Sequence, residues 1–62
     1  MARFKLTKKN TRYPIEEGEV VFINANSEWD ITSEMLEEAV KNQLNKRLSY
    51  LFSRLDWQIE KV

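Results

Sequence analysis

Residues 32–55 of this 62-residue chain read TSEMLEEAVKNQLNKRLSYLFSRL and contain neither glycine nor proline. The apolar residues of this stretch recur at intervals of three and four positions, which places them on one face of an α-helix. The spacing therefore predicts a long amphipathic helix from Ser33 to about Arg54. Its main apolar stripe consists of Leu36, Val40, Leu44, Leu48, Leu51 and Leu55.

The start of this helix has clear signals and its end has none. Thr32 is a suitable N-cap, and Ile31 and Leu36 stand at the two positions of a hydrophobic staple. No residue after Ser33 is a glycine or a proline. Three endings therefore remain open: near Ser49, near Ser53, or beyond Trp57.

Two strands are predicted before the helix. Residues 3–8 alternate, with Phe4 and Leu6 on one side and polar residues on the other, which indicates a half-buried strand. Its lysines suit the edge of a sheet. Residues 19–23 read EVVFI and are apolar on both faces, which indicates a central strand covered on both sides.

A third strand is predicted after the helix, because Trp57 and Ile59 alternate with Gln58 and Glu60. The alternative is that the helix continues through Trp57. The predicted order is β-β-α-β, an α+β fold in which a three-stranded sheet packs on one long amphipathic helix. Residues 1–62 would form a single small domain. The first two strands are expected to be antiparallel, and the third to run parallel to the second after a right-handed crossover.

The predicted helix is too long for the predicted sheet. A helix over residues 33–54 would span roughly 33 Å, whereas a six-residue strand spans about 20 Å. The far end of the apolar stripe would then need a second chain, and we expect a homodimer or another protein partner. The expected contact residues are Leu44, Leu48, Leu51, Phe52 and Leu55. The alternative is that the later leucines and Phe52 close the monomer core around Trp57.

The charges are segregated along the chain although the formal net charge is zero. Residues 1–14 hold five bases and no acid, residues 15–38 hold eight acids and no base, and residues 39–62 hold five bases and two acids. The basic N-terminal strand and loop mix cations with aromatic rings, a pattern that suits phosphate contacts and base stacking. The candidate nucleic-acid contacts are Arg3, Lys5, Lys8, Lys9, Arg12 and Tyr13.

A structural interpretation of the same charges competes with nucleic-acid binding. The lysines would keep an edge strand from aggregating and would pair with the acidic residues of the second strand. Zero net charge also disfavours a dedicated nucleic-acid binder.

Trp29 is open to two interpretations as well: it is an exposed binding anchor, or it folds back over the start of the helix.

The composition excludes several classes of chemistry. The chain has no cysteine and no histidine, so disulfides, Cys/His zinc sites and a Ser-His-Asp triad are not available. Gly18 is the only glycine, so a glycine-rich phosphate loop is not available either. No apolar run approaches the roughly 20 residues of a membrane span, and we expect no signal peptide because the first five residues lack an apolar stretch. We therefore expect a cytoplasmic protein without metal, cofactor or catalytic activity.

The sequence thus predicts a non-catalytic protein-interaction module that self-associates through the C-terminal half of its helix. The second hypothesis, from a different class, is a weak nucleic-acid-binding protein that uses the basic N-terminal strand and loop.

Overall fold

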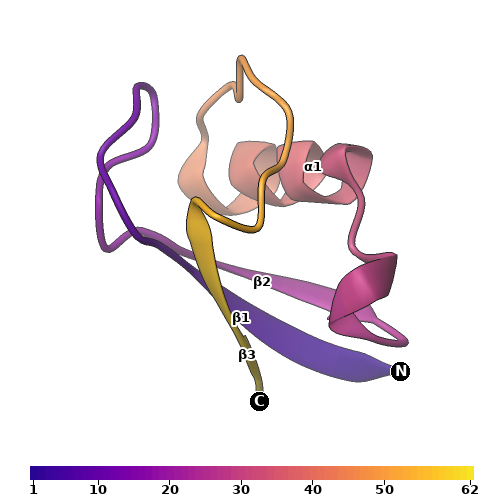
Figure 1. Ribbon diagram of the computed structural model, residues 1–62. Coiled ribbons are helices and arrows are strands. Elements are labelled where there is room, and N and C mark those ends of the chain that lie inside the picture. The colour runs from indigo at the N-terminus through magenta and orange to yellow at the C-terminus, as the bar shows by residue number, and fades with distance from the viewer.

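The computed structural model describes residues 1–62 and has an α+β fold, as the sequence predicts. Three strands form one antiparallel sheet in the order β2-β1-β3, and the helix packs on one face of that sheet (Figure 1). The elements are β1 (Ala2–Lys8), β2 (Val20–Ala25), the 3₁₀ turn η1 (Glu28–Asp30), α1 (Ser33–Leu44) and β3 (Trp57–Lys61).

The central strand is β1, so the prediction of β1 as an edge and β2 as the centre is wrong. Phe4 and Leu6 of β1 are buried beneath the helix side of the sheet, as their alternation predicts. Arg3 and Lys5 project from the opposite face, which no other element covers. Charged side chains suit an open face as well as an edge, and the sequence pattern does not distinguish the two.

The third strand begins at Trp57, so the predicted β3 is confirmed and the helix does not continue there. β2 and β3 are both antiparallel to β1 and therefore point in the same direction, as expected. They are not neighbours, however, because β1 lies between them.

The helix begins where the sequence predicts. The Oγ1 of Thr32 accepts a hydrogen bond from the N–H of Met35 at 3.2 Å, and Ile31 and Leu36 are both buried. It ends at Leu44, so the predicted extension to Arg54 is wrong. Asn45 has φ 55° and ψ 40°, the left-handed conformation that stops a helix and that asparagine tolerates.

This early end removes the length mismatch. A helix of 12 residues is about 18 Å long, which matches strands of five to seven residues. The leucines after residue 44 therefore do not form a helical seam, and the argument for a partner from helix length no longer holds.

Residues 45–56 form an irregular segment, called here the covering segment, that leads from α1 back to β3 (Figure 1). Helix α1 packs mainly on β2, and the covering segment packs beside it over β1 and the start of β3. Leu48 is buried in the core, and Tyr50 and Phe52 are half-buried against it. The helix thus covers one half of the core, and the covering segment covers the other half.

The core holds apolar residues from all three strands, from α1 and from the connections between the elements. Its members are Phe4, Leu6, Ile15, Val21, Ile23, Ala25, Ile31, Leu36, Ala39, Val40, Leu48 and Trp57. Neither α1 nor η1 combines the length and apolar character that crossing a bilayer requires.

Candidate interaction surface

A buried lysine lies under the covering segment. Lys8 ends β1 on the helix side of the sheet, and its side chain is inaccessible to solvent. Its Nζ donates to Oδ1 of Asn10 at 2.9 Å and lies 4.0 Å from Oδ2 of Asp56. The rings of Trp57 and Tyr50 are 5.6 and 5.8 Å away. Burial lowers the pKa of Lys8; Asp56 partly offsets this effect, and the nearby Arg12 adds to it.

Arg12 connects the loop after β1 to the covering segment. Its guanidinium lies 4.0 Å from the ring centre of Tyr50 and 3.5 Å from Oδ2 of Asp56. The hydroxyl of Tyr50 donates to the carbonyl of Arg12 at 3.1 Å. Burial raises the pKa of Tyr50; the positive charge of Arg12 lowers it, and the carboxylate of Asp56 raises it. These contacts hold the middle of the covering segment against the loop.

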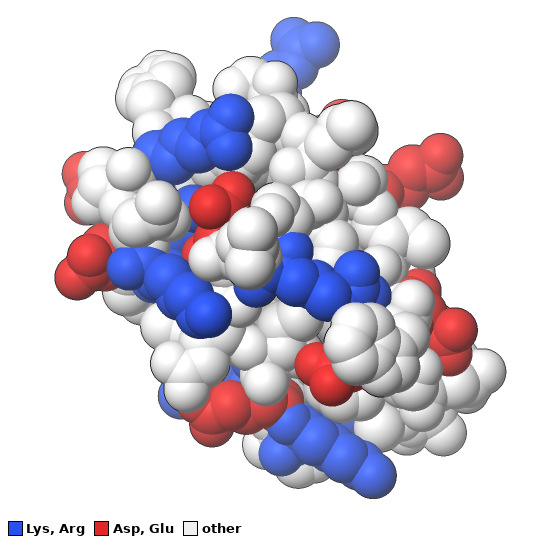
Figure 2. Space-filling view, in the orientation of Figure 1, with Lys and Arg blue, Asp and Glu red and all other residues white.

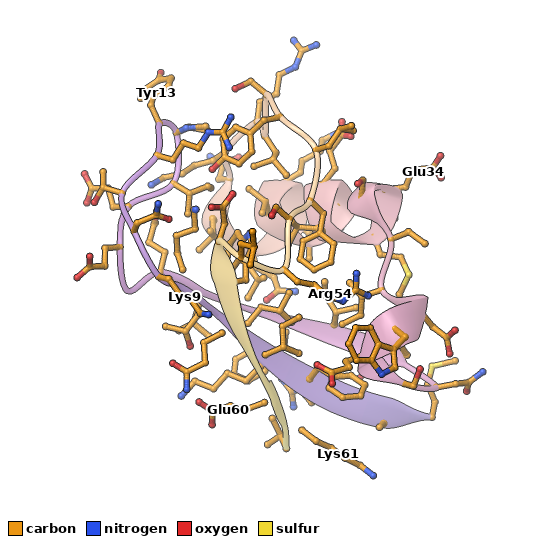
Figure 3. All side chains as sticks on the ribbon, viewed as in Figure 1. Lys9, Tyr13, Glu34, Arg54, Glu60 and Lys61 are labelled. Carbon is orange, nitrogen blue, oxygen red and sulfur yellow. The ribbon has the colours of Figure 1, made fainter.

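Arg54 connects the end of the covering segment to η1. Its Nη2 donates to the carbonyl of Glu28 at 2.8 Å, and its guanidinium lies 4.9 Å from the ring centre of Trp29 and 5.2 Å from that of Phe52. Figure 3 shows this side chain between the start of β3 and η1. The N–H of Phe52 also donates to Oγ of Ser33 at 3.1 Å. The covering segment is therefore fixed to three other parts of the chain.

The five predicted partner residues divide into two groups. Leu48 is buried, and Leu44 and Phe52 are half-buried, so these three belong mainly to the monomer core. Leu51 is 79% exposed and Leu55 is 85% exposed. The structure therefore leaves two leucines in solvent on a segment that is otherwise fixed.

Trp29 is the largest exposed apolar side chain outside the covering segment, at 72% exposure. The alternative in which it folds over the start of the helix is not what the structure shows. It instead stacks beside Arg54, which lies on the segment that leads into β3. The sequence does not reveal this contact because residues 29 and 54 are far apart along the chain.

The predicted nucleic-acid residues do not form one surface. Lys8 is buried, and Arg12 is engaged with Tyr50 and Asp56, as described above. Lys9 and Tyr13 are exposed on the loop that follows β1 (Figure 3). On the face that Figure 2 shows, basic and acidic side chains are interspersed rather than gathered by sign.

Arg3 and Lys5 lie together on the open face of the sheet, apart from the other predicted cations. The guanidinium of Arg3 lies 4.4 Å from the ring centre of Phe22 on β2. Glu60 is the cross-strand neighbour of Lys5 on β3. The open face thus combines two cations, one ring and one acid.

The ion pairs differ from the expected pairing between the basic arm and the acidic strand. Lys8 and Arg12 both face Asp56, while Glu19 pairs with Lys46 at 2.8 Å. The hydrogen bond from Lys46 lowers the pKa of Glu19, and the backbone N–H of Glu16 lowers it further.

The outer edge of β2 is closed at its middle by a side chain from α1. The N–H of Phe22 donates to Oε1 of Gln43 at 2.8 Å, and Nε2 of Gln43 donates to the carbonyl of Phe22 at 2.7 Å. The amide of Gln43 thus forms the pair of bonds that a neighbouring strand would form. Sequence reasoning missed this contact, because in the sequence Gln43 is one polar residue among several in the helix.

The outer edge of β3 is open. The N–H of Val62, just after β3, donates to the carbonyl of Arg3 at 2.8 Å. Along an antiparallel strand, the backbone N–H and C=O groups of successive residues point alternately to one side and to the other. The backbone groups of the even-numbered residues of β3 therefore point toward β1. The backbone groups of Ile59 and Lys61 consequently point away from the sheet, and no hydrogen bond joins them to another part of the chain.

No group of three or more acidic side chains is placed to hold a metal ion. A surface hollow of about 470 Å³ at the end of α1 is lined only by polar residues, among them Glu37, Lys41 and Arg47.

Comparison of the chain with protein-family models, with curated proteins and with solved structures found no match.

Proposed function

We propose that this chain is a non-catalytic protein-interaction module that self-associates as a homodimer. The observation that carries the proposal is the exposure of Leu51 and Leu55 on the covering segment. Contacts from Arg12, Tyr50 and Arg54 join this segment to the rest of the chain, so the two leucines project from a segment with defined contacts. A contiguous exposed apolar patch is typical of a binding surface, and we propose that these two leucines contribute to one.

The size of the chain supports the same proposal. A domain of about 60 residues buries only about 60% of the surface that its unfolded chain exposes, and this one has neither disulfide nor metal cluster. Small domains of this kind are commonly stabilised by a second copy. The proposed interface uses the covering segment in place of a helix, with Leu51 and Leu55 in contact and Leu44, Leu48 and Phe52 supporting them from within the core.

Sedimentation equilibrium tests the proposal. We expect the wild-type chain to be a dimer and the double variant Leu51→Glu, Leu55→Glu to be a folded monomer, with its fold checked by circular dichroism. Tyr13→Glu is the matched control, because Tyr13 is 89% exposed at the tip of a different loop. A wild-type chain that stays monomeric at about 100 μM, where a dissociation constant near 1 μM would give mostly dimer, overturns the proposal.

Binding to single-stranded nucleic acid is the second candidate, and one observation favours it. Arg3 and Lys5 share the open face of the sheet with Phe22, an arrangement that offers phosphate contacts beside a ring. The test is a salt-dependent gel shift with Arg3→Glu, Lys5→Glu. Lys8 and Arg12 are unsuitable for charge reversal because they hold the covering segment. Absence of binding by the wild-type chain at about 50 mM salt would exclude this candidate.

A further inference from the structure

We infer that two copies of this chain pair antiparallel along the open edges of their β3 strands and join their sheets into one continuous sheet. This inference rests on the proposed self-association and adds the edge of β3 to the contact proposed for Leu51 and Leu55. The strand that pairs with this edge is β3 of a second copy of the same chain. Three observations support this assignment: the unpaired backbone groups of β3, the register that they allow, and the charges that this register brings together.

The two edges of the sheet differ in the state of their backbone groups. At β3 the N–H and C=O groups of Ile59 and Lys61 point outward without partners. Unpaired groups of this kind are a template for another strand. At β2 the corresponding groups of Phe22 are already bonded to Gln43. Strand addition is therefore open at β3 and closed at the middle of β2.

One register overlaps all five residues of both β3 strands, and it is centred on Ile59. In this register each Ile59 exchanges N–H···O=C bonds with Ile59 of the second copy, since its groups are the outward ones. Glu60 then faces Gln58 of the second copy, and Lys61 faces Trp57 of the second copy. No pair of like charges is opposed. A register centred on Glu60 would place two glutamates opposite each other, which is unfavourable.

An exposed apolar residue flanks β3 at each end. Leu55 precedes β3 and is 85% exposed, while Val62 follows β3 and is 71% exposed. In the register centred on Ile59, Val62 of one copy faces Asp56 of the second, so Leu55 lies one position beyond the overlap.

Charge substitutions at position 58 test the register. Gln58 is exposed, its cross-strand neighbour is the neutral Thr7, and its Nε2 donates to Oε1 of Glu60 in the same chain at 3.1 Å. This contact within one chain is present in monomer and dimer alike, so a change in the dissociation constant reports on the second copy. The dimer contains two pairs in which position 58 lies opposite Glu60 of the other copy. Gln58→Lys would make both pairs attractive, and Gln58→Glu would make both pairs repulsive. At about 0.5 kcal/mol per pair, we expect Gln58→Lys to tighten the dimer about fivefold and Gln58→Glu to weaken it about fivefold.

Asn24→Lys and Asn24→Glu are the controls for net charge, because they carry the same charge changes on the opposite edge strand, where the cross-strand neighbour is Arg3. We expect the two Asn24 variants to have dissociation constants close to that of the wild type. Equal responses at positions 58 and 24 would show a net-charge effect and overturn the β3 contact.

A backbone substitution tests the edge itself. Lys61→Pro removes an outward N–H that the monomer does not use, and proline is tolerated on edge strands. Lys61→Ala is the control that removes the side chain and keeps the N–H. We expect dimerisation to be lost in the proline variant and kept in the alanine variant.

The two proposals fail in different ways. A monomeric wild-type chain overturns both the self-association and its contact. A wild-type dimer whose dissociation constant is unchanged by Lys61→Pro and by both Gln58 variants overturns the β3 contact alone. If Lys61→Pro fails to fold, the opposite shifts expected for the two Gln58 variants decide the question.

Discussion

At the scale of single residues, Lys8 shows how a charge can be kept inside a small core. Its ammonium is buried with Asn10, Asp56 and two aromatic rings around it. Replacing a buried charge by an apolar side chain of similar size is often neutral or stabilising. We expect Lys8→Met to keep the free energy of unfolding within about 1 kcal/mol of wild type, or to raise it, because methionine fits beside aromatic rings.

Lys8→Glu is the contrasting variant. It would bury a carboxylate beside Asp56, and we expect the chain to be largely unfolded. Urea denaturation followed by circular dichroism compares the two variants. A Lys8→Glu chain as stable as wild type would contradict the burial of Lys8.

The lowered pKa of Lys8 determines how the free energy of unfolding changes with pH. The pKa of Lys8 is lower in the folded chain than the ordinary value of 10.5, so its charged form disfavours folding. This penalty is complete below the folded pKa and is relieved as the pH rises toward 10.5. The raised pKa of Tyr50 acts in the opposite direction above its ordinary value of 10.0. We therefore expect the free energy of unfolding of wild type, relative to Lys8→Met, to increase as the pH rises through the folded pKa of Lys8 toward about 10.

The Glu19–Lys46 pair gives a second prediction at this scale. The pKa of Glu19 lies below its ordinary value of 4.5 because Lys46 donates to the carboxylate. Its stabilising contribution is present above pH 4.5 and is lost as the pH falls through the folded pKa. We expect Lys46→Met to raise the pKa of Glu19, and Lys41→Met, in the last turn of α1, to leave it unchanged. An NMR titration of the Glu19 carboxyl carbon measures both, and equal pKa values in the two variants would contradict the pair.

At the scale of elements, the beginnings of the strands and of the helix could be predicted from the sequence, but the end of the helix could not. Thr32 and Ile31 are local signals, and they act within one turn. Helical spacing continues to Leu55, yet Leu48 is buried from an irregular segment. Helix α1 covers mainly β2, and the covering segment buries the rest of that face of the sheet. This division depends on the three-dimensional arrangement of the elements, so local sequence signals do not reveal it.

Asn45 tests where the helix ends. Its positive φ is strained for most side chains, by about 1–2 kcal/mol, but not for glycine. We expect Asn45→Ala to lower the free energy of unfolding by about 1 kcal/mol, and Asn45→Gly to leave it unchanged or to raise it. Urea denaturation measures the difference. A more stable alanine than glycine variant would indicate that the helix continues beyond residue 45.

Gln43 tests the difference between the two sheet edges. We expect Gln43→Ala to leave the N–H and C=O of Phe22 unpaired and so to open the edge of β2. A chain with two open edges can extend beyond a dimer, so light scattering is expected to show larger assemblies. Asn42→Ala, at the next exposed position of α1, is the control and should remain a dimer. An unchanged size for Gln43→Ala would contradict the closing role of Gln43.

At the scale of the whole molecule, the candidate surface was only partly predictable. Leu51 and Leu55 are apolar residues that helical spacing assigns to one seam, and they are the two leucines that the structure leaves exposed. The open edge of β3 could not be predicted, because it depends on strand order. The segregated charges along the chain also become mixed in space, since Lys8 and Arg12 meet Asp56 and Glu19 meets Lys46.

Amide hydrogen exchange at increasing protein concentration measures the pairing of β3 most directly. We expect the amides of Ile59 and Lys61 to exchange rapidly in dilute solution and to become protected as the concentration rises. The amide of Phe22, bonded to Gln43, serves as an internal reference that stays protected throughout. Exchange at Ile59 and Lys61 that is equally fast at all concentrations, in a chain that sedimentation shows to be dimeric, would contradict pairing through β3.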